Sequence, residues 1–317
     1  MNKDDLSNDI LDVYNDDRLS TPKDVTGSLV RGPSRGYITI AQNSEDIDYL
    51  EMSYALALSL KASQEHNKLC VCVDEETKKL ITDKHRDVFD AIVDIPWNDD
   101  AKGDKWKIHN KWKYPHMTPY DETIILDSDM IFTESVDYWW DYLSKKDVWC
   151  CTNVKTFRNE DVTSDYYRKK FTQLNLPNVY SNFTYFKKSE LTYEFFKMVE
   201  LIMTHWNVYF DKFLAGVGQN WMSADVAYAL AIQLLDIEAE TCDYDIKDVP
   251  TFVHMKSMVQ NVPVNMVESN WTKSITSELG DDLQVKIGNF TQTLPVHYVE
   301  KNWMDENKIK QLEDAVL

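Results

Sequence analysis

Residues 122–132 read ETIILDSDMIF, an apolar run that leads directly into two aspartates one residue apart. The run ETIIL is rich in aliphatic and β-branched residues, which is typical of a buried strand. Side chains at positions i and i+2 of an extended chain point to the same side, so we expect the carboxylates of Asp127 and Asp129 to converge just beyond the strand. Two unpaired carboxylates are costly in apolar surroundings, and the pattern therefore predicts a cation as their partner.

The chemistry of this pair favours a hard divalent cation. Carboxylate oxygens are the ligands that Mg²⁺ and Mn²⁺ prefer, whereas zinc prefers nitrogen and sulfur. A bare Asp-x-Asp pair is most often a solvated surface feature, and the chain carries two more, at 46–48 and 243–245. Only the pair at 127–129 has apolar residues on both sides. A cation held there would stabilise a departing diphosphate.

The segments around this stretch alternate between strand-like and helix-like patterns. Strands are predicted at 36–43, 68–73, 91–95, 122–126, 147–151 and 178–186, with short ones within 251–255 and 294–299. Helices are predicted at 46–63, 105–117, 135–145, 191–206 and 223–235 and at the C-terminal end, with Pro115 and Pro119 ending the second of them; residues 152–178 are predicted to be irregular. The alternation predicts an α/β fold with a mostly parallel sheet flanked by helices, whose ligands bind at the carboxyl edge of the strands.

Bulk properties predict one domain preceded by an arm. The chain has 317 residues, of which 43% are hydrophobic and 12% aromatic, enough for one large core. Residues 1–35 are highly charged and predicted to form a weakly ordered N-terminal arm, which leaves 36–317 as the domain. No apolar run is long enough for a membrane span. The acidic, polar start is unlike a secretory signal, and the five cysteines read as reduced thiols, so a cytoplasmic location is expected.

The formal net charge of −19 constrains the ligands. Non-specific binding of nucleic acid depends on neutralising phosphates with Lys and Arg, and no long basic run is present. The same charge repels a free nucleotide, so a nucleotide site needs a metal ion or a few well-placed lysines. The lysines within 102–113, together with Arg31 and Arg35, would supply a local basic rim.

Six segments, taken in order, resemble those of GT-A-fold glycosyltransferases of the glycogenin and bacterial galactosyltransferase type. The resemblance covers 36–303 and includes the Asp-x-Asp stretch itself. The six segments are GYITIAQN (36–43), YLEMSYALALSLKAS (49–63), HNKWKYPHMTPYDETIILDSDMIF (109–132), NVYSNFTYFKKS (178–189), SADVAYALA (223–231) and PVHYVEKNW (295–303). The resemblance implies a single GT-A-like domain that moves a sugar from a nucleotide-diphosphate sugar, typically a UDP-sugar, to an acceptor hydroxyl with retention of configuration.

The resemblance also implies roles for individual residues. Asp127, Asp129 and His297 would bind Mn²⁺ or Mg²⁺. The donor would be held by other side chains: Ile40, Gln42, Asn43 and Ser128 on the nucleotide, Lys111 on the sugar or diphosphate, and Lys301 on the diphosphate. Asn182 and Asp225 would line the sugar and acceptor side, with Asp225 positioning the acceptor rather than forming a covalent intermediate.

The terminal motif departs from the family pattern. His297 and Lys301 are only four residues apart with no glycine between them, and Asn302 stands where the family has a proline. The segment that covers the diphosphate is therefore expected to differ.

Several residues keep a second interpretation. His254 also ends a short predicted strand and competes with His297 as the third ligand. Asp225 could instead cap its helix, and Lys111 could belong to a solvated lysine face.

Two further functional hypotheses remain open at this point. One is a phage enzyme that glycosylates a hydroxymethylated base in DNA, acting in the host cytoplasm. The other is a non-catalytic protein that binds nucleotide sugars. A continuous basic groove leading to Asp129 would favour DNA, whereas an isolated pocket would favour a glycan, protein or small acceptor. The sugar, the acceptor and the oligomeric state are not determined by the sequence.

Overall fold

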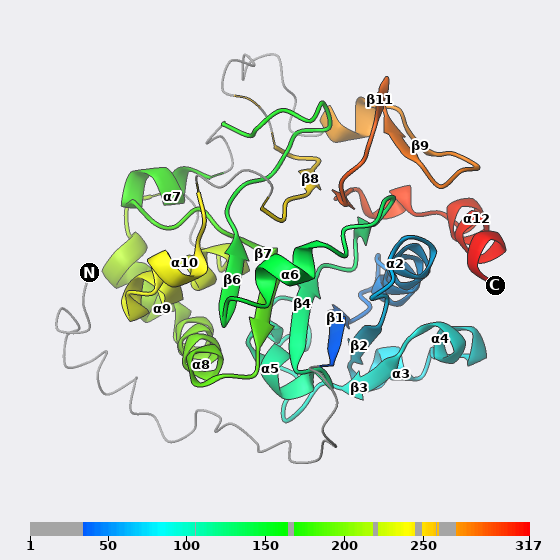
Figure 1. Ribbon diagram of the computed structural model, residues 1–317. Helices are drawn as coiled ribbons and strands as arrows, with labels where there is room; N and C mark the ends of the chain where they lie inside the picture. The colour runs from blue at the N-terminus through cyan, green and yellow to red at the C-terminus, as the bar shows by residue number, and fades with distance from the viewer. Residues whose placement is uncertain are drawn as a thin grey trace.

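The computed structural model describes residues 34–104, 106–163, 168–217, 221–244, 249–257, 259 and 271–317 (Figure 1). The expected N-terminal arm, apart from its last two residues, lies outside this part of the chain, as do Arg31 and Lys105. The fold class is as predicted: a mixed α/β unit built on a central sheet.

The central sheet has six strands in the order β3-β2-β1-β4-β7-β6. Strands β3, β2, β1 and β4 run parallel, and β7 runs antiparallel to both of its neighbours. The bounds are β1 Arg35–Ala41, β2 Leu69–Val73, β3 Ala91–Asp94, β4 Glu122–Leu126, β6 Val148–Cys151 and β7 Tyr180–Lys187. All five residues of β4 are buried, as expected for a strand that the sequence predicts from its apolar run.

Helices cover both faces of this sheet because its strands are apolar on both sides. Along β1, Tyr37 joins the core cluster beneath α2 (Tyr49–Ser63) and α12 (Glu306–Val316), while Ile38 joins the cluster beneath α8 (Glu190–Thr204) and α10 (Ala224–Leu235). Figure 1 shows the C-terminal α12 beside α2, and the two helices are in contact. Asp48 accepts a hydrogen bond from Glu51 N and caps α2, as Ser189 caps α8.

Shorter helical segments connect these elements. The α-helices are α3 Glu75–Lys78, α4 Asp83–Val88, α5 Tyr114–Met117, α6 Trp139–Leu143, α7 Lys169–Leu174, α9 Trp206–Tyr209 and α11 Glu238–Thr241; Lys111–Lys113, Trp271–Ser274 and Lys301–Trp303 form 3₁₀ turns, and Phe210–Leu214 a π turn. The cysteines are buried and unpaired. None of the described helices is both long and apolar enough to span a membrane.

Two predictions about local structure were wrong. The helix expected at 105–117 is a 3₁₀ turn at Lys111–Lys113 followed by α5. Pro115 lies in the first turn of α5 instead of ending a helix, because a first-turn residue needs no backbone N–H donor. The stretch 152–178, expected to be irregular, contains α7.

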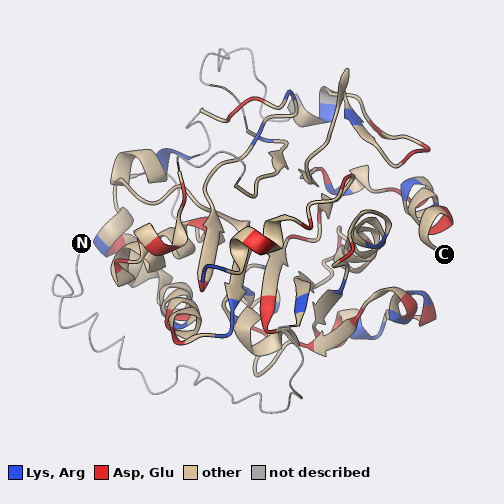
Figure 2. Ribbon diagram, viewed as in Figure 1, with Lys and Arg blue, Asp and Glu red and all other residues tan. Residues whose placement is uncertain are grey.

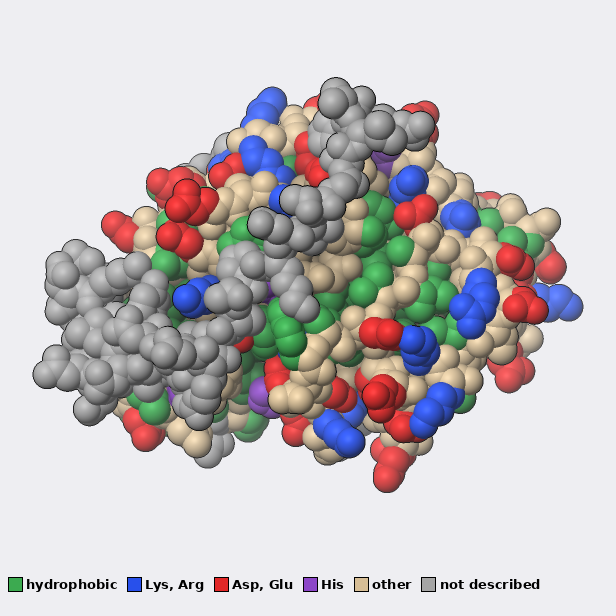
Figure 3. Space-filling model, turned by 90° about the horizontal axis from the view of Figure 1, so that it is seen from below, with side chains coloured by type: hydrophobic (Ala, Val, Ile, Leu, Met, Phe, Trp, Pro, Cys, Tyr) green, Lys and Arg blue, Asp and Glu red, His purple; other side chains and the backbone are tan. Residues whose placement is uncertain are grey.

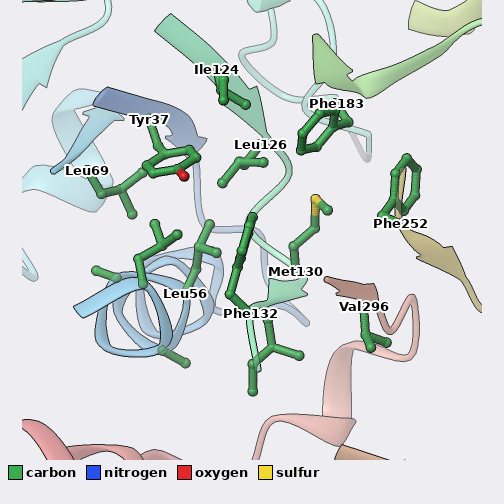
Figure 4. Packing of buried hydrophobic residues seen from close by; sticks show 14 of the residues in the cluster. Tyr37, Leu56, Leu69, Ile124, Leu126, Met130, Phe132, Phe183, Phe252 and Val296 are labelled. Carbon is green, nitrogen blue, oxygen red and sulfur yellow. The ribbon is translucent and has the colours of Figure 1, made fainter. Parts of the chain in front are cut away.

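Two small sheets complete the C-terminal part. One contains β9 Ser277–Leu279, β10 Val285–Ile287 and β11 Phe290–Thr291. The other has the order β5-β12-β8, formed by Met130–Ile131, Val296–His297 and Val253–His254. Its interior is continuous with the main core, and Figure 4 shows Leu126, Met130 and Phe183 close together where the two sheets meet. This small sheet positions the site.

Candidate functional site

The carboxylates of Asp127 and Asp129 converge at the carboxyl end of β4, as the sequence predicted. The Asp129 side chain is only 3% exposed and that of Asp127 is 25% exposed. His297 completes the group: one ligand atom from each of the three residues lies within 4.8 Å of the others.

Backbone pairing brings His297 to this place from the far end of the chain. In the small sheet, His297 pairs with Met130, the residue after Asp129, and Tyr298 N donates to Asp129 O at 3.1 Å. His297 Nε2 then lies 2.9 Å from Asp129 Oδ2, and its Nδ1 lies 3.1 Å from Asn182 Nδ2. Because an amide nitrogen only donates, His297 Nδ1 accepts from Asn182, and Nε2 carries the proton that faces Asp129.

His254, the rival for the third ligand, lies on the next strand and outside the group. Its ring centroid is 5.1 Å from that of His297, and its Nδ1 contacts Ser257 Oγ at 2.9 Å. Burial, assisted by the neighbouring His297, lowers the pKa of His254 well below its usual value. His254 is therefore a neutral, half-buried neighbour of the site.

Two lysines already pair with the carboxylates. Lys111 Nζ lies 2.6 Å from Asp127 Oδ1, and Lys301 Nζ lies 2.5 Å from Asp129 Oδ2. Burial alone would raise the pKa of Asp129, but His297 and Lys301 more than offset it and hold that pKa well below the usual range. Each carboxylate of the pair thus has a lysine as its ion-pair partner.

A pocket of about 140 Å³ opens beside the two aspartates. Its lining includes five residues that the family resemblance assigns to the donor: Ile40, Gln42, Lys111, Ser128 and Lys301. Others were missed, because isolated aromatic and hydroxyl residues carry no sequence signal for a site: Thr39, Tyr49, Trp106 and Tyr114. Within the described chain, the buried Thr39 Oγ1 has no hydrogen-bond partner.

Two residues predicted to contact the nucleotide have structural partners. Asn43 Oδ1 accepts from Leu50 N and its Nδ2 donates to Asp48, so this side chain fixes the start of α2. Gln42 lines the pocket, but its amide is bound to Asp74, Asp99 and Asn110.

Asp225 lies in the first turn of α10, and its carboxylate points to β7 and α7 rather than capping the helix. Ser181 donates to Asp225 Oδ1 through its N (2.9 Å) and its Oγ (2.6 Å), and Arg168 Nη1 lies 2.5 Å from Oδ2. Burial would raise the pKa of Asp225, but Arg168 and Ser181 offset it and lower that pKa. Arg168 itself lies between the rings of Phe171 and Tyr180.

Several basic residues of the predicted rim are engaged with protein groups. Lys113 is fully buried and pairs with Asp100 at 3.0 Å, Lys107 donates to Ala101 O at 3.0 Å, and Arg35 pairs with Glu122 at 2.8 Å. Figure 2 shows basic and acidic positions interspersed along the ribbon. On the face in Figure 3, Lys and Arg side chains likewise lie among Asp and Glu wherever the described residues are visible.

Comparisons with known proteins identify the fold. No protein-family model matches the chain, and no curated protein matches it in sequence. An active-site mutant of LgtC is similar in structure, with 12% identity over 89% of this chain and 96% of that one, at a TM-score of 0.50. The galactosyltransferase LgtC with donor and acceptor sugar analogs (13% identity, 88% and 95% covered, TM-score 0.47) and mouse xyloside xylosyltransferase 1 (12%, 66% and 84%, 0.43) are also similar. The chain has the GT-A fold that its sequence resembles.

Proposed function

We propose that the chain is a metal-dependent glycosyltransferase that moves a sugar from a nucleotide-diphosphate sugar, preferably a UDP-sugar, to an acceptor hydroxyl. The observation that carries this proposal is the meeting of Asp127, Asp129 and His297 with two lysines beside a pocket, at the carboxyl edge of a GT-A sheet. Ligands of open α/β sheets bind at that edge.

The residues fit a divalent cation. Two carboxylates and one imidazole nitrogen provide an oxygen-rich, partly buried donor set whose atoms are close enough to share one ion, and such a set suits Mn²⁺ or Mg²⁺. Asp127, Asp129 and His297 would hold it. When bound, the cation supplies positive charge that stabilises the departing diphosphate.

The remaining residues bind and orient. Lys111 and Lys301 line the pocket and would donate to the diphosphate oxygens, where negative charge accumulates as the sugar departs. Ile40 and Ser128 line the pocket and would contact the donor. Asn182 would orient the His297 ring through its hydrogen bond to Nδ1, and it would line the acceptor side of the site.

Asp225 suits a positioning role rather than that of a nucleophile, because Arg168 and Ser181 engage both of its oxygens. Without a protein nucleophile, the acceptor hydroxyl would attack from the donor side, with retention of configuration.

Donor hydrolysis tests the proposal and separates it from a non-catalytic nucleotide-sugar binder. A panel of UDP-, GDP- and other nucleotide sugars is incubated with the protein in Mn²⁺ or in EDTA, and release of nucleotide is measured. We expect at least one donor, with UDP-sugars first, to be hydrolysed only with the metal. Absence of turnover for every donor, despite binding, would support the non-catalytic hypothesis.

The acceptor is more consistent with a glycan, a protein or a small molecule than with DNA. The described lysines near the pocket are mostly engaged with protein groups, which leaves few of them for a phosphate backbone. Transfer of labelled sugar to duplex DNA containing hydroxymethylated bases, with unmodified duplex as the control, checks this preference. Efficient transfer to the modified duplex would reverse it.

His297→Ala is expected to weaken Mn²⁺ binding, measured by electron paramagnetic resonance in the presence of UDP, by about 100-fold. Loss of an outer partner of a metal ligand already costs about 10- to 100-fold, and this variant removes a ligand. His254→Ala is the matched control, since the two rings are neighbours but only His297 faces the carboxylates. A larger loss in the His254 variant would reverse the assignment.

A further inference from the structure

The lysines beside the aspartates occupy the oxygens that a metal ion would need. Lys301 Nζ is 2.5 Å from Asp129 Oδ2, the same oxygen that faces His297 Nε2 at 2.9 Å, and Lys111 Nζ is 2.6 Å from Asp127 Oδ1. Two negative side chains are thus balanced by two positive ones. A cation that binds to these oxygens must displace the ammonium groups.

We propose that Lys301, together with Lys111, is an exchangeable counterion: it neutralises the carboxylates when the site is empty and transfers to the diphosphate when a divalent cation and a nucleotide bind together. This inference rests on the proposed function and adds a coupling between the two ligands. The cation alone would leave two ammonium groups beside a new positive charge. The diphosphate alone would meet carboxylates whose lysines are already engaged. Only together do the ligands give every charge an opposite partner.

Lys301 has room for this movement. Its side chain is 24% exposed, whereas Asp129 is 3% exposed. It follows β12 on a single 3₁₀ turn, and it lines both the pocket beside the aspartates and a larger groove of about 790 Å³ between α2 and α12. Its ammonium also lies 5.6 Å from the centre of the Tyr49 ring, which lines the same pocket. The four-residue spacing after His297 places the lysine beside Asp129.

The test is Lys301→Met, with Mn²⁺ binding followed by electron paramagnetic resonance with and without UDP. In the wild-type protein, UDP is expected to tighten Mn²⁺ binding by about 10- to 100-fold, and Mn²⁺ to tighten UDP binding by the same factor. In the Lys301→Met variant, the affinities for Mn²⁺ and for UDP should change in opposite directions. Mn²⁺ alone should bind about tenfold more tightly, because no ammonium competes for Asp129, while UDP at saturating Mn²⁺ should bind about tenfold more weakly, because the diphosphate loses its lysine.

Lys84→Met is the matched control, because Lys84 lines the same groove but pairs with Glu51. It removes one nearby positive charge without touching the aspartates, and both affinities should stay at the wild-type values. Lys111→Met is a second test variant, and it too should bind Mn²⁺ alone more tightly and UDP at saturating Mn²⁺ more weakly.

The possible outcomes distinguish failure of the lysine exchange from failure of the proposed function. Wild-type binding of Mn²⁺ with UDP, combined with unchanged or weaker binding of Mn²⁺ alone in both lysine variants, would overturn the exchange and leave the proposed function standing. Equal tightening by Lys84→Met would reduce the effect to overall charge and also overturn it. Failure of the wild-type protein to bind UDP with Mn²⁺ would overturn both.

Discussion

Asp129→Asn is expected to lower kcat/KM for Mn²⁺-dependent donor turnover by about a thousandfold. The substitution keeps the shape of the side chain but removes the charge at the centre of the group formed with Asp127 and His297. Metal stabilisation of a transition state contributes several kcal/mol, and about 4 kcal/mol corresponds to this factor. Steady-state rates at saturating Mn²⁺ measure it.

The same variant should remain folded. Lys301 loses its partner, but its side chain is partly exposed and can turn to solvent, so the free energy of unfolding should fall by only about 1–3 kcal/mol. Asp46→Asn is the control, because it makes the same change in another Asp-x-Asp pair, on the groove beside α2. An Asp129→Asn variant that keeps its turnover would show that the aspartate is structural.

Arg168→Met is expected to lower the free energy of unfolding by about 2–3 kcal/mol at pH 7, because it removes the charged hydrogen-bond partner of a partly buried carboxylate. Arg168 lies 2.5 Å from the partly buried Asp225 and over two aromatic rings. Methionine can fill the space between the rings but leaves the carboxylate without its cation. Urea unfolding measures the loss, and Arg158→Met, at an exposed arginine over Phe157, is the control.

The loss should depend on pH. In the wild-type protein the pKa of Asp225 is lowered by Arg168 and Ser181 despite burial, so the pair stabilises the fold above the unfolded pKa of about 3.9 and this contribution fades as the pH falls through the lower folded pKa. In the variant, burial without the cation favours the neutral acid. The stability difference from wild type should therefore be largest at neutral pH and shrink below about pH 4. A stability difference between variant and wild type that is the same at neutral pH and below about pH 4 would contradict the ion-pair account.

The sequence predicted the parts of the site that depend on local pattern. The apolar run before Asp127 predicted β4 and the common direction of the two carboxylates. Both features depend only on the local sequence pattern and not on contacts with distant segments. The strand pattern alone did not separate His254 from His297, since each ends a two-residue strand, and His297 was preferred for the Lys301 and Trp303 that follow it. That choice depends on strand pairing: only β12 lies beside β5, which follows Asp129 directly.

Long-range ion pairs were also beyond the sequence. Arg168 lies in a polar stretch without periodicity, and its pairing with Asp225 spans 57 residues. Lys111 and Lys301 were recognised as donor-binding candidates, but their contacts with the aspartates depend on two 3₁₀ turns that bring distant parts of the chain together.

Calorimetric titration of UDP into the wild-type protein, in Mn²⁺ and again in EDTA, tests the central claim most directly. The account predicts clear binding with Mn²⁺ that disappears in EDTA, because the diphosphate is held by the site only when the cation at Asp127, Asp129 and His297 is present. UDP binding of equal strength in EDTA, or no binding in Mn²⁺, would contradict it.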